Sequence, residues 1–153
     1  MNQLNNNILP AIRNIKDLEK LIKTDYKMCV LLDMHIGHIK SIMELLKQNH
    51  IECFIHIDLI KGLSHDEFAS EFIIQQYKPK DSQALKRSID LIKKVEPDFV
   101  EVLPGVASKA IHHIQKETNT QVIAGGLINT IDEVNVAVKN GAKYVTTSYD
   151  KLW

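Results

Sequence analysis

Residues 28–33 read Met-Cys-Val-Leu-Leu-Asp, an uninterrupted apolar run that ends in a carboxylate. Runs of this kind are typical of strands that are buried on both faces, as the strands of a parallel sheet are. The residues after the run carry apolar side chains at the spacing of one helical face; these are Ile39, Ile42, Met43, Leu45 and Leu46. A buried strand followed by an amphipathic helix is the repeating unit of parallel α/β folds.

The same strand–helix unit recurs along the rest of the chain. Further apolar runs predict strands at residues 8–12, 53–58, 98–103, 122–126 and 143–147. Capping-box patterns start two helices, at Ser64–Glu67 and Thr130–Glu133, and Asn140-Gly141 is typical of a helix end. Parallel strands with right-handed crossovers form either an open doubly wound sheet or a barrel. The repeat of roughly 20–25 residues favours the α/β fold of the (β/α)8 TIM-barrel type.

The composition indicates one soluble domain, which we expect to span residues 1–153. Apolar residues make up 44% of the chain, and 19 basic residues balance 19 acidic ones. Zero net charge disfavours a general basic coat for nucleic acid, although a local basic patch remains compatible with it. Cys29 and Cys53 lie inside apolar runs and are interpreted as buried free thiols. The chain shows neither an apolar run long enough to span a membrane nor a secretory signal, which predicts a cytoplasmic protein without a membrane partner.

The alternation of strands and helices fails at one place. The helix predicted after Ser64 extends towards Tyr77 and meets the next helix across Lys80 and Asp81, with no strand between them. Six strands are therefore predicted where a barrel has eight. Two strands and one helix, roughly thirty to forty residues at this repeat length, would complete the barrel. We expect a chain break or a deletion between Lys80 and Asp81, with a partner such as a second copy in a homodimer covering the open strand edges. The alternative is a smaller six-stranded sheet with a short helix–helix connection.

Two loops at the carboxyl ends of the last two predicted strands suit a phosphate group. Gly125 and Gly126 allow close backbone approach and can point N–H groups at an anion. Thr146, Thr147 and Ser148 follow in the next such loop and add hydroxyl donors. Because barrels commonly bind phosphate in the loops after their last two strands, this pair of loops predicts a small phosphorylated ligand.

Two short motifs offer metal ligands as an alternative. Asp33-x-His35 and His56-x-Asp58 would place both members of each pair on one face of a strand. The spacing resembles that of the metal sites of pentulose-phosphate epimerases of the (β/α)8 class. The two motifs occur in a different order along the chain, however, so no metal is predicted.

Taken together, the blocks at the strand ends resemble the family of glycerol uptake operon antiterminator regulatory proteins. The blocks are ILPAIR (8–13), VLLDMHIGH (30–38), HIDLIKGLSHDE (56–67), VEVLPG (100–105), IAGGLI (123–128) and VTTS (145–148). The resemblance implies a (β/α)8 barrel in the bacterial cytoplasm that binds glycerol 3-phosphate. It also implies action on leader mRNA that prevents premature transcription termination of glycerol genes. In this family a strand, a helix and a further strand precede the block that matches Asp81-Ser82, and that segment is missing here.

The resemblance and the strand-end pattern together assign roles to particular residues. The phosphate is expected on Gly125, Gly126, Thr146, Thr147 and Ser148. The glycerol moiety is expected to meet Arg13, Asp33, His56, Asp58 and Glu101. The RNA is expected to meet a basic run that contains Lys86, Arg87, Lys93 and Lys94. No catalytic residue, metal or cofactor is predicted besides the effector glycerol 3-phosphate. The alternative function is that of an isomerase or epimerase on a small phosphorylated sugar, with strand-end acids as general acid and base.

Overall fold

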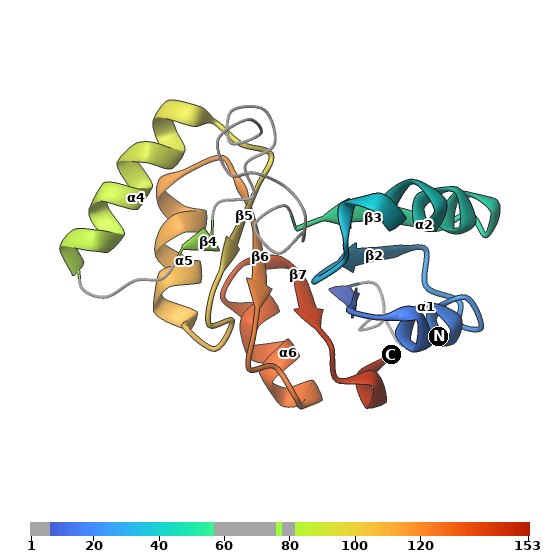
Figure 1. The fold of residues 1–153 in the computed structure, drawn as a ribbon. Coiled ribbons are helices and arrows are strands. Elements are labelled where there is room, and N and C mark those ends of the chain that lie inside the picture. Colours follow the sequence, from blue (N-terminus) through green and yellow to red (C-terminus); the bar gives the residue numbers. More distant parts are fainter. Residues whose placement is uncertain (1–6, 57–75, 78–81) are drawn as a thin grey trace. The chain divides into compact units, whose positions relative to one another are not determined.

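The computed structural model describes residues 7–56, 76–77 and 82–153, which form parallel strands and the helices that connect most of them (Figure 1). In chain order the elements are β1 (Ile8–Ile12), α1 (Ile15–Leu21), β2 (Met28–Leu31), α2 (Ile36–Gln48), β3 (Glu52–Ile55), β4 (Gln76–Tyr77), α4 (Ser82–Val95), β5 (Phe99–Val102), α5 (Ser108–Glu117), β6 (Gln121–Gly125), α6 (Ile131–Lys139), β7 (Ala142–Thr147) and the 3-10 helix η3 (Asp150–Leu152). The chain divides into two compact parts, and each is described by itself. The N-terminal part contains Leu9–Ile73 and the C-terminal part contains Ile74–Thr147. Among the described residues, no helix has both the length and the apolar character that crossing a membrane requires.

In the N-terminal part, two helices cover one face of a parallel three-stranded sheet. β2 pairs with β1 on one side and with β3 on the other, with Ile12 opposite Leu31 and Leu31 opposite Ile55. The core between sheet and helices contains Leu18 and Leu21 of α1, Ile39, Ile42 and Leu46 of α2, and Ile12, Cys29 and Leu31 of the strands. These helical residues recur every three or four positions, so each helix buries one stripe.

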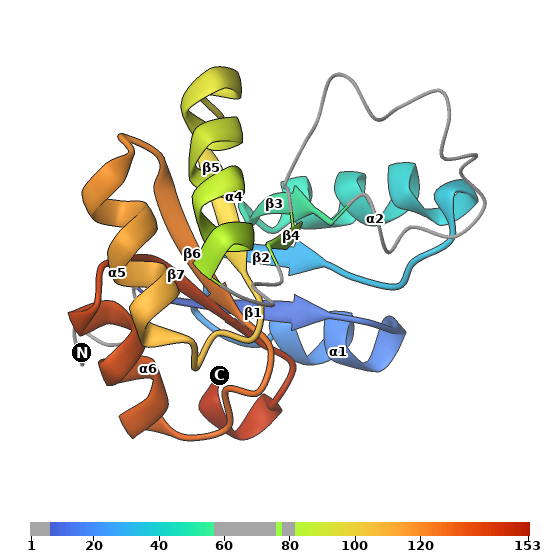
Figure 2. The same ribbon diagram turned by 90° about the vertical axis from the view of Figure 1, so that its left-hand side faces the viewer.

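In the C-terminal part, β4, β5, β6 and β7 pair in that order, and all the pairs are parallel. α5 packs against β6 and β7, α6 packs against β7, and α4 packs against α5 (Figure 2). Consecutive residues of the central strands, such as Val122, Ile123 and Ala124 of β6, are all buried. Burial on both faces explains why these strands have continuous apolar sequences rather than alternating ones.

All six predicted strands are present: β1 has the predicted bounds, and the ends of the other strands differ by at most three residues from the apolar runs. β4 is an additional strand. It pairs Gln76 with Glu101 and Tyr77 with Val102, so Tyr77 belongs to a strand and not to the helix predicted there. Two residues are too few to show a periodic pattern, which is why the sequence did not reveal this strand. The helix predicted at Ser64–Glu67 and the Lys80–Asp81 junction lie outside the described residues.

The capping box predicted for α6 is confirmed. The Thr130 hydroxyl accepts the backbone N–H of Glu133 at 3.2 Å, and the Glu133 carboxylate accepts the N–H groups of Thr130 at 2.9 Å and of Asn129 at 2.8 Å. The Asn129 N–H and the contacts with Thr130 lower the pKa of Glu133 below its ordinary value. At the other end Asn140 is the C-cap and Gly141 follows with φ +106°, the conformation that glycine adopts most easily.

Replacing Thr130 with alanine should lower the free energy of unfolding by about 1 kcal/mol, because the N–H of Glu133 would lose its acceptor. Urea unfolding followed by circular dichroism would measure the change. Thr130→Ser keeps the hydroxyl and should cost far less. Equal losses for the two variants would contradict a capping role for the Thr130 oxygen.

Candidate functional site

A buried carboxylate lies near the carboxyl end of β5. The Glu101 side chain is only 5% exposed, and the Thr146 hydroxyl of β7 donates a hydrogen bond to its Oε1 at 2.8 Å. A carboxylate removed from water is costly unless hydrogen bonds replace its hydration. The hydrogen bond from Thr146 therefore replaces part of the hydration that the Glu101 carboxylate loses on burial.

Gly125 leaves the space that this contact occupies. β6 lies between β5 and β7, and Gly125 pairs with Thr146. A Cβ atom on Gly125 would collide with the carboxylate of Glu101 and would lie 2.7 Å from the Thr146 hydroxyl oxygen. The sequence predicted that a glycine here lets a ligand approach. In the structure, the side chains of Glu101 and Thr146 occupy the space beside Gly125 in which a side chain at position 125 would lie.

Gly105, two residues after the strand predicted at residues 98–103, also lies beside Gly125. Its N–H donates to the carbonyl oxygen of Gly125 and, at 3.1 Å, to that of Gly126. A Cβ on Gly105 would lie 2.9 Å from the Gly125 nitrogen, so the two loops touch through their backbones. The Pro104-Gly105 pair after the strand predicted at residues 98–103 was the only sequence signal for this contact. Gly126 itself is exposed and has φ +74°.

The hydroxyl groups of the two threonines at the end of β7 both donate hydrogen bonds to other atoms of the protein. Thr146 donates to Glu101, and Thr147 donates to the carbonyl oxygen of Ile128 at 2.8 Å. Both residues are buried, whereas Ser148, directly after β7, is exposed. Of the five residues predicted to hold a phosphate, only Gly126 and Ser148 therefore present an exposed surface.

In the N-terminal part, the predicted site residues lie where β1, β2 and β3 end. Arg13 is exposed after β1, Asp33 is exposed after β2 with φ +57°, and His56 is 2% exposed directly after β3. The prediction that Asp33 and His35 alternate along one strand is wrong, because β2 ends at Leu31. His35 instead caps α2, and its Nδ1 accepts the N–H of Gly37 at 3.1 Å.

The described part of the chain contains no group of three or more His, Cys, Asp or Glu side chains that could hold a metal ion. Of the four candidate ligands, Asp33, His35 and His56 lie in this part and Asp58 lies outside it. The Nδ1 of His35 is engaged with the helix backbone. That nitrogen would have to leave Gly37 before it could bind a metal.

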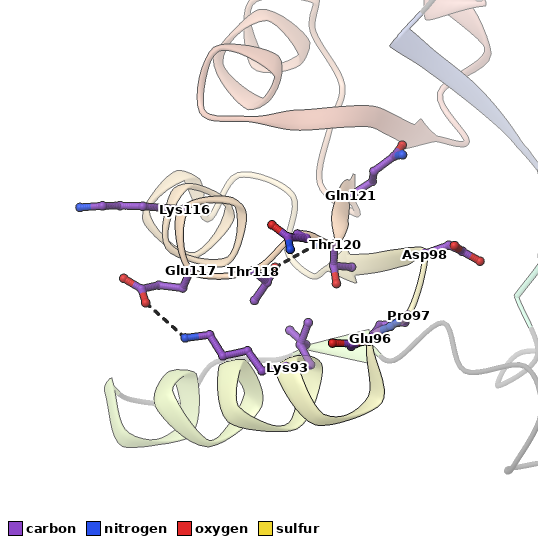
Figure 3. A pocket seen from close by; sticks show the side chains of 11 residues that line it. Lys93, Glu96, Pro97, Asp98, Lys116, Glu117, Thr118, Thr120 and Gln121 are labelled. Carbon is purple, nitrogen blue, oxygen red and sulfur yellow. Dashed lines mark hydrogen bonds and ion pairs between the residues drawn. The ribbon is translucent and has the colours of Figure 1, made fainter.

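The basic residues predicted to meet RNA form an exposed surface on α4, called here the α4 basic patch: Lys86, Arg87, Lys93 and Lys94. Lys86 and Lys93 are seven residues apart, about two helical turns, and thus lie on one side of the helix. Lys93 pairs with Glu117 of α5 at 3.4 Å (Figure 3). This ion pair reduces the positive charge that Lys93 offers to a phosphate.

A polar pocket lies beside Lys93, at the amino ends of β5 and β6 (Figure 3). Its walls come from the last turns of α4 and α5 and from the segments that lead into the two strands, including Asp98 and Thr120. This is the end of the strands opposite to Glu101 and Gly125. Ligand sites of α/β proteins lie at the carboxyl ends, so this pocket is not part of the predicted phosphate site.

The sequence matches the family model described as glycerol-3-phosphate responsive antiterminator, in two pieces that cover residues 8–80 and 79–153. The pieces meet at residues 79–80, beside the Lys80–Asp81 junction where the sequence pattern predicts a break or deletion.

Two crystal structures are similar over nearly the whole chain. One is of a glycerol uptake operon antiterminator regulatory protein from Listeria monocytogenes, 30% identical with a TM-score of 0.86, and the match covers 100% of this chain and 96% of that one. The other is of a glycerol uptake operon antiterminator-related protein from Thermotoga maritima, 26% identical with a TM-score of 0.78, covering 95% and 96%.

A third structure, of an aldolase called QR15, is 12% identical with a TM-score of 0.65 and covers 97% of this chain and 93% of that one. At this identity the likeness concerns the fold alone. The predicted α/β fold class of the TIM-barrel type is confirmed.

Replacing Gly125 with alanine should destabilise the protein by about 2–4 kcal/mol, because the new methyl group overpacks the site and disrupts the buried hydrogen bond between Thr146 and Glu101. Gly37→Ala is the matched control, since its Cβ would meet only the exposed His35 ring, at 3.3 Å. Urea unfolding of both variants would measure the difference. Similar small effects at the two positions would show that Gly125 is not confined by Glu101.

Proposed function

This chain belongs to the family of glycerol-3-phosphate responsive antiterminators, and we propose that it is a cytoplasmic regulator that binds glycerol 3-phosphate and, when bound, acts on leader mRNA. The observation that carries the proposal is the family match, which extends from residue 8 to residue 153. The names of the Listeria and Thermotoga proteins support regulation of glycerol uptake as the setting. No catalytic step is proposed, since the likeness to the aldolase concerns the fold alone.

The contacts among Glu101, Gly125 and Thr146 in the C-terminal part support different roles for neighbouring residues in binding the ligand. Gly126 is exposed in a left-handed conformation, so its backbone is proposed to face the phosphate. Glu101 would repel a phosphate but can accept a hydrogen bond from a glycerol hydroxyl. Thr146 then acts as a positioning residue, since it orients the carboxylate by donating to it. The roles of Arg13, Asp33, Asp58, His56 and Ser148 stay predictions from the sequence.

We also propose that the chain lacks, relative to its family, a segment between Lys80 and Asp81. The two-piece family match, whose pieces meet beside this junction, supports the proposal. The ligand or RNA contacts made by that segment in other members would then be absent here. A homodimer that covers the neighbouring strand edges remains a prediction.

Glycerol 3-phosphate should raise the melting temperature, and glycerol should do so far less, because a ligand that binds only the folded state stabilises it. At a ligand concentration of about 100 Kd the gain is about 2.7 kcal/mol. Differential scanning fluorimetry with glycerol 3-phosphate, glycerol and inorganic phosphate would measure the shifts. Equal shifts with glycerol and with glycerol 3-phosphate would contradict a phosphate-binding site.

Gly126→Asp should abolish the shift, since a carboxylate there repels the phosphate. Gly126→Asn is the matched control, because asparagine has the same size, adopts positive φ with similar ease and carries no charge. Asparagine should therefore weaken binding less than aspartate does. Normal binding by the aspartate variant would remove Gly126 from the site.

Neutralising the α4 basic patch with Lys→Gln and Arg→Gln changes should weaken leader-RNA binding and flatten its salt dependence. The log–log slope should fall by about one unit for each lost phosphate contact. The contribution of Lys93 should be the smallest, because it is paired with Glu117. Gel shifts with and without glycerol 3-phosphate, at several salt concentrations, would measure affinity and slope.

The control replaces four exposed lysines of the N-terminal part with glutamine: Lys16, Lys23, Lys40 and Lys47. This variant has the same net charge as the α4 variant, so it separates a local patch from general attraction. If both variants lose affinity equally, the patch has no special role. If neither loses any, RNA binds elsewhere or not at all.

A further inference from the structure

The two cysteines of the chain lie side by side on neighbouring strands. Cys29 of β2 pairs in register with Cys53 of β3, and both are free thiols. Adjacent strands are about 4.7–4.9 Å apart. This spacing falls within the range of about 4.4–6.8 Å that Cα atoms span in disulfides. Paired residues of neighbouring parallel strands point to the same face of the sheet, so the two side chains lie next to each other and a small approach of the strands would let their sulfur atoms meet.

The two thiols have unequal surroundings. Cys29 is 0% exposed in the core beneath α1 and α2, whereas Cys53 packs against that core and is half-buried. The Cys53 thiol donates a hydrogen bond to the carbonyl oxygen of Phe54 at 3.4 Å. The neighbouring Cys53 thiol and burial raise the pKa of Cys29, whereas the neighbouring Cys29 thiol lowers the pKa of Cys53. Cys53 is therefore the thiol that more readily becomes a thiolate, the reactive form.

Cys53 can also be reached from solvent. It lines an open pocket between α2 and the start of β3. The charged groups of this pocket are Lys40, Glu44 and Lys47 of α2 and Glu52 of β3, beside the apolar side chain of Met43. A small uncharged oxidant can enter such a pocket. Cys29 is not among the residues that line this pocket and has no exposed surface of its own.

We propose that Cys29 and Cys53 form a redox-active pair that hydrogen peroxide converts into an intramolecular disulfide. The Cys53 thiolate attacks one peroxide oxygen, an S–O bond forms, the O–O bond breaks, and the departing hydroxide takes a proton to become water. Cys29 then loses its proton and attacks the Cys53 sulfur. The S–S bond forms, the S–O bond breaks, and the second hydroxide leaves as water with that proton. The pair loses two electrons, and the peroxide is reduced to two water molecules.

The strand geometry also makes the bond reversible. In-register Cβ atoms of neighbouring strands stay close to the strand spacing, wider than the mean of about 3.8 Å in disulfides. A disulfide held at such a distance is more easily reduced than a relaxed one, as the labile and regulatory disulfides are. Neither cysteine belongs to the proposed ligand or RNA surface. The inference therefore holds or fails independently of the proposed function.

The test treats the full-length folded protein with hydrogen peroxide, removes the peroxide, unfolds the protein in urea with iodoacetamide to block the remaining thiols, and digests it with trypsin. The two cysteines fall in different tryptic peptides, residues 28–40 and 48–61. We expect these peptides to be joined in monomeric protein, and dithiothreitol to separate them. Cys29→Ala should leave Cys53 as a sulfenic acid that dimedone labels. Cys53→Ala should leave Cys29 unmodified while the protein stays folded.

Two results would overturn the proposal. One is a wild-type protein in which Cys53 is oxidised to sulfinic acid without any link to Cys29. The other is a link that forms only when peroxide acts on protein unfolded in urea, while both thiols of the protein treated in its folded state are afterwards found free. Because the wild-type chain alone gives these readouts, a variant that fails to fold does not decide the outcome.

Discussion

The burial of one carboxylate constrains the carboxyl ends of three strands in the C-terminal part. Glu101 comes from β5, its hydrogen-bond donor Thr146 comes from β7, and Gly125 of the intervening β6 leaves the space for both. A one-residue slip of either pairing would turn a polar group to the opposite face of the sheet. The carboxylate would then be buried without its partner, which is among the most costly defects a core can contain. The hydrogen bond between Thr146 and Glu101 thereby favours the observed register of β5, β6 and β7 over shifted registers that would bury apolar side chains equally well.

The parts of the fold that could be predicted are those that depend on local pattern. Continuous apolar runs indicated the six strands because a parallel strand is buried on both faces, and the spacing of Thr130 and Glu133 indicated a capping box that the structure contains. β4 could not be predicted, since its two residues are a strand only through their pairing with Glu101 and Val102. Asp33 and His35 were misplaced for a related reason. The apolar run does not show that the strand stops at Leu31 and that the imidazole caps the next helix.

In the candidate site, likewise, the sequence predicts where residues lie better than what their side chains contact. Glu101, Gly125 and Thr146 could be predicted to gather, because the carboxyl ends of parallel strands share one edge. Their mutual contacts depend on the directions of side chains from three separate strands, which no single stretch of sequence contains. The hydroxyl of Thr147 was expected to face a ligand and instead ties the end of β7 to the backbone of Ile128. In the N-terminal part, the pairing of Cys29 with Cys53 likewise depends on the register of β2 and β3.

The contact between Gly105 and Gly125 also limits how this region can change in evolution. A side chain at position 105 would meet the backbone of Gly125, and a side chain at position 125 would meet Glu101 and Thr146. A shorter residue in place of Glu101 would have to come before any larger residue at position 125, and it would leave the Thr146 hydroxyl without its acceptor. A single substitution at position 101, 105 or 125 is therefore disfavoured as long as the residues around it stay unchanged. Lineages that diverge in this region should do so through linked substitutions in several strands, not through single replacements that accumulate one at a time.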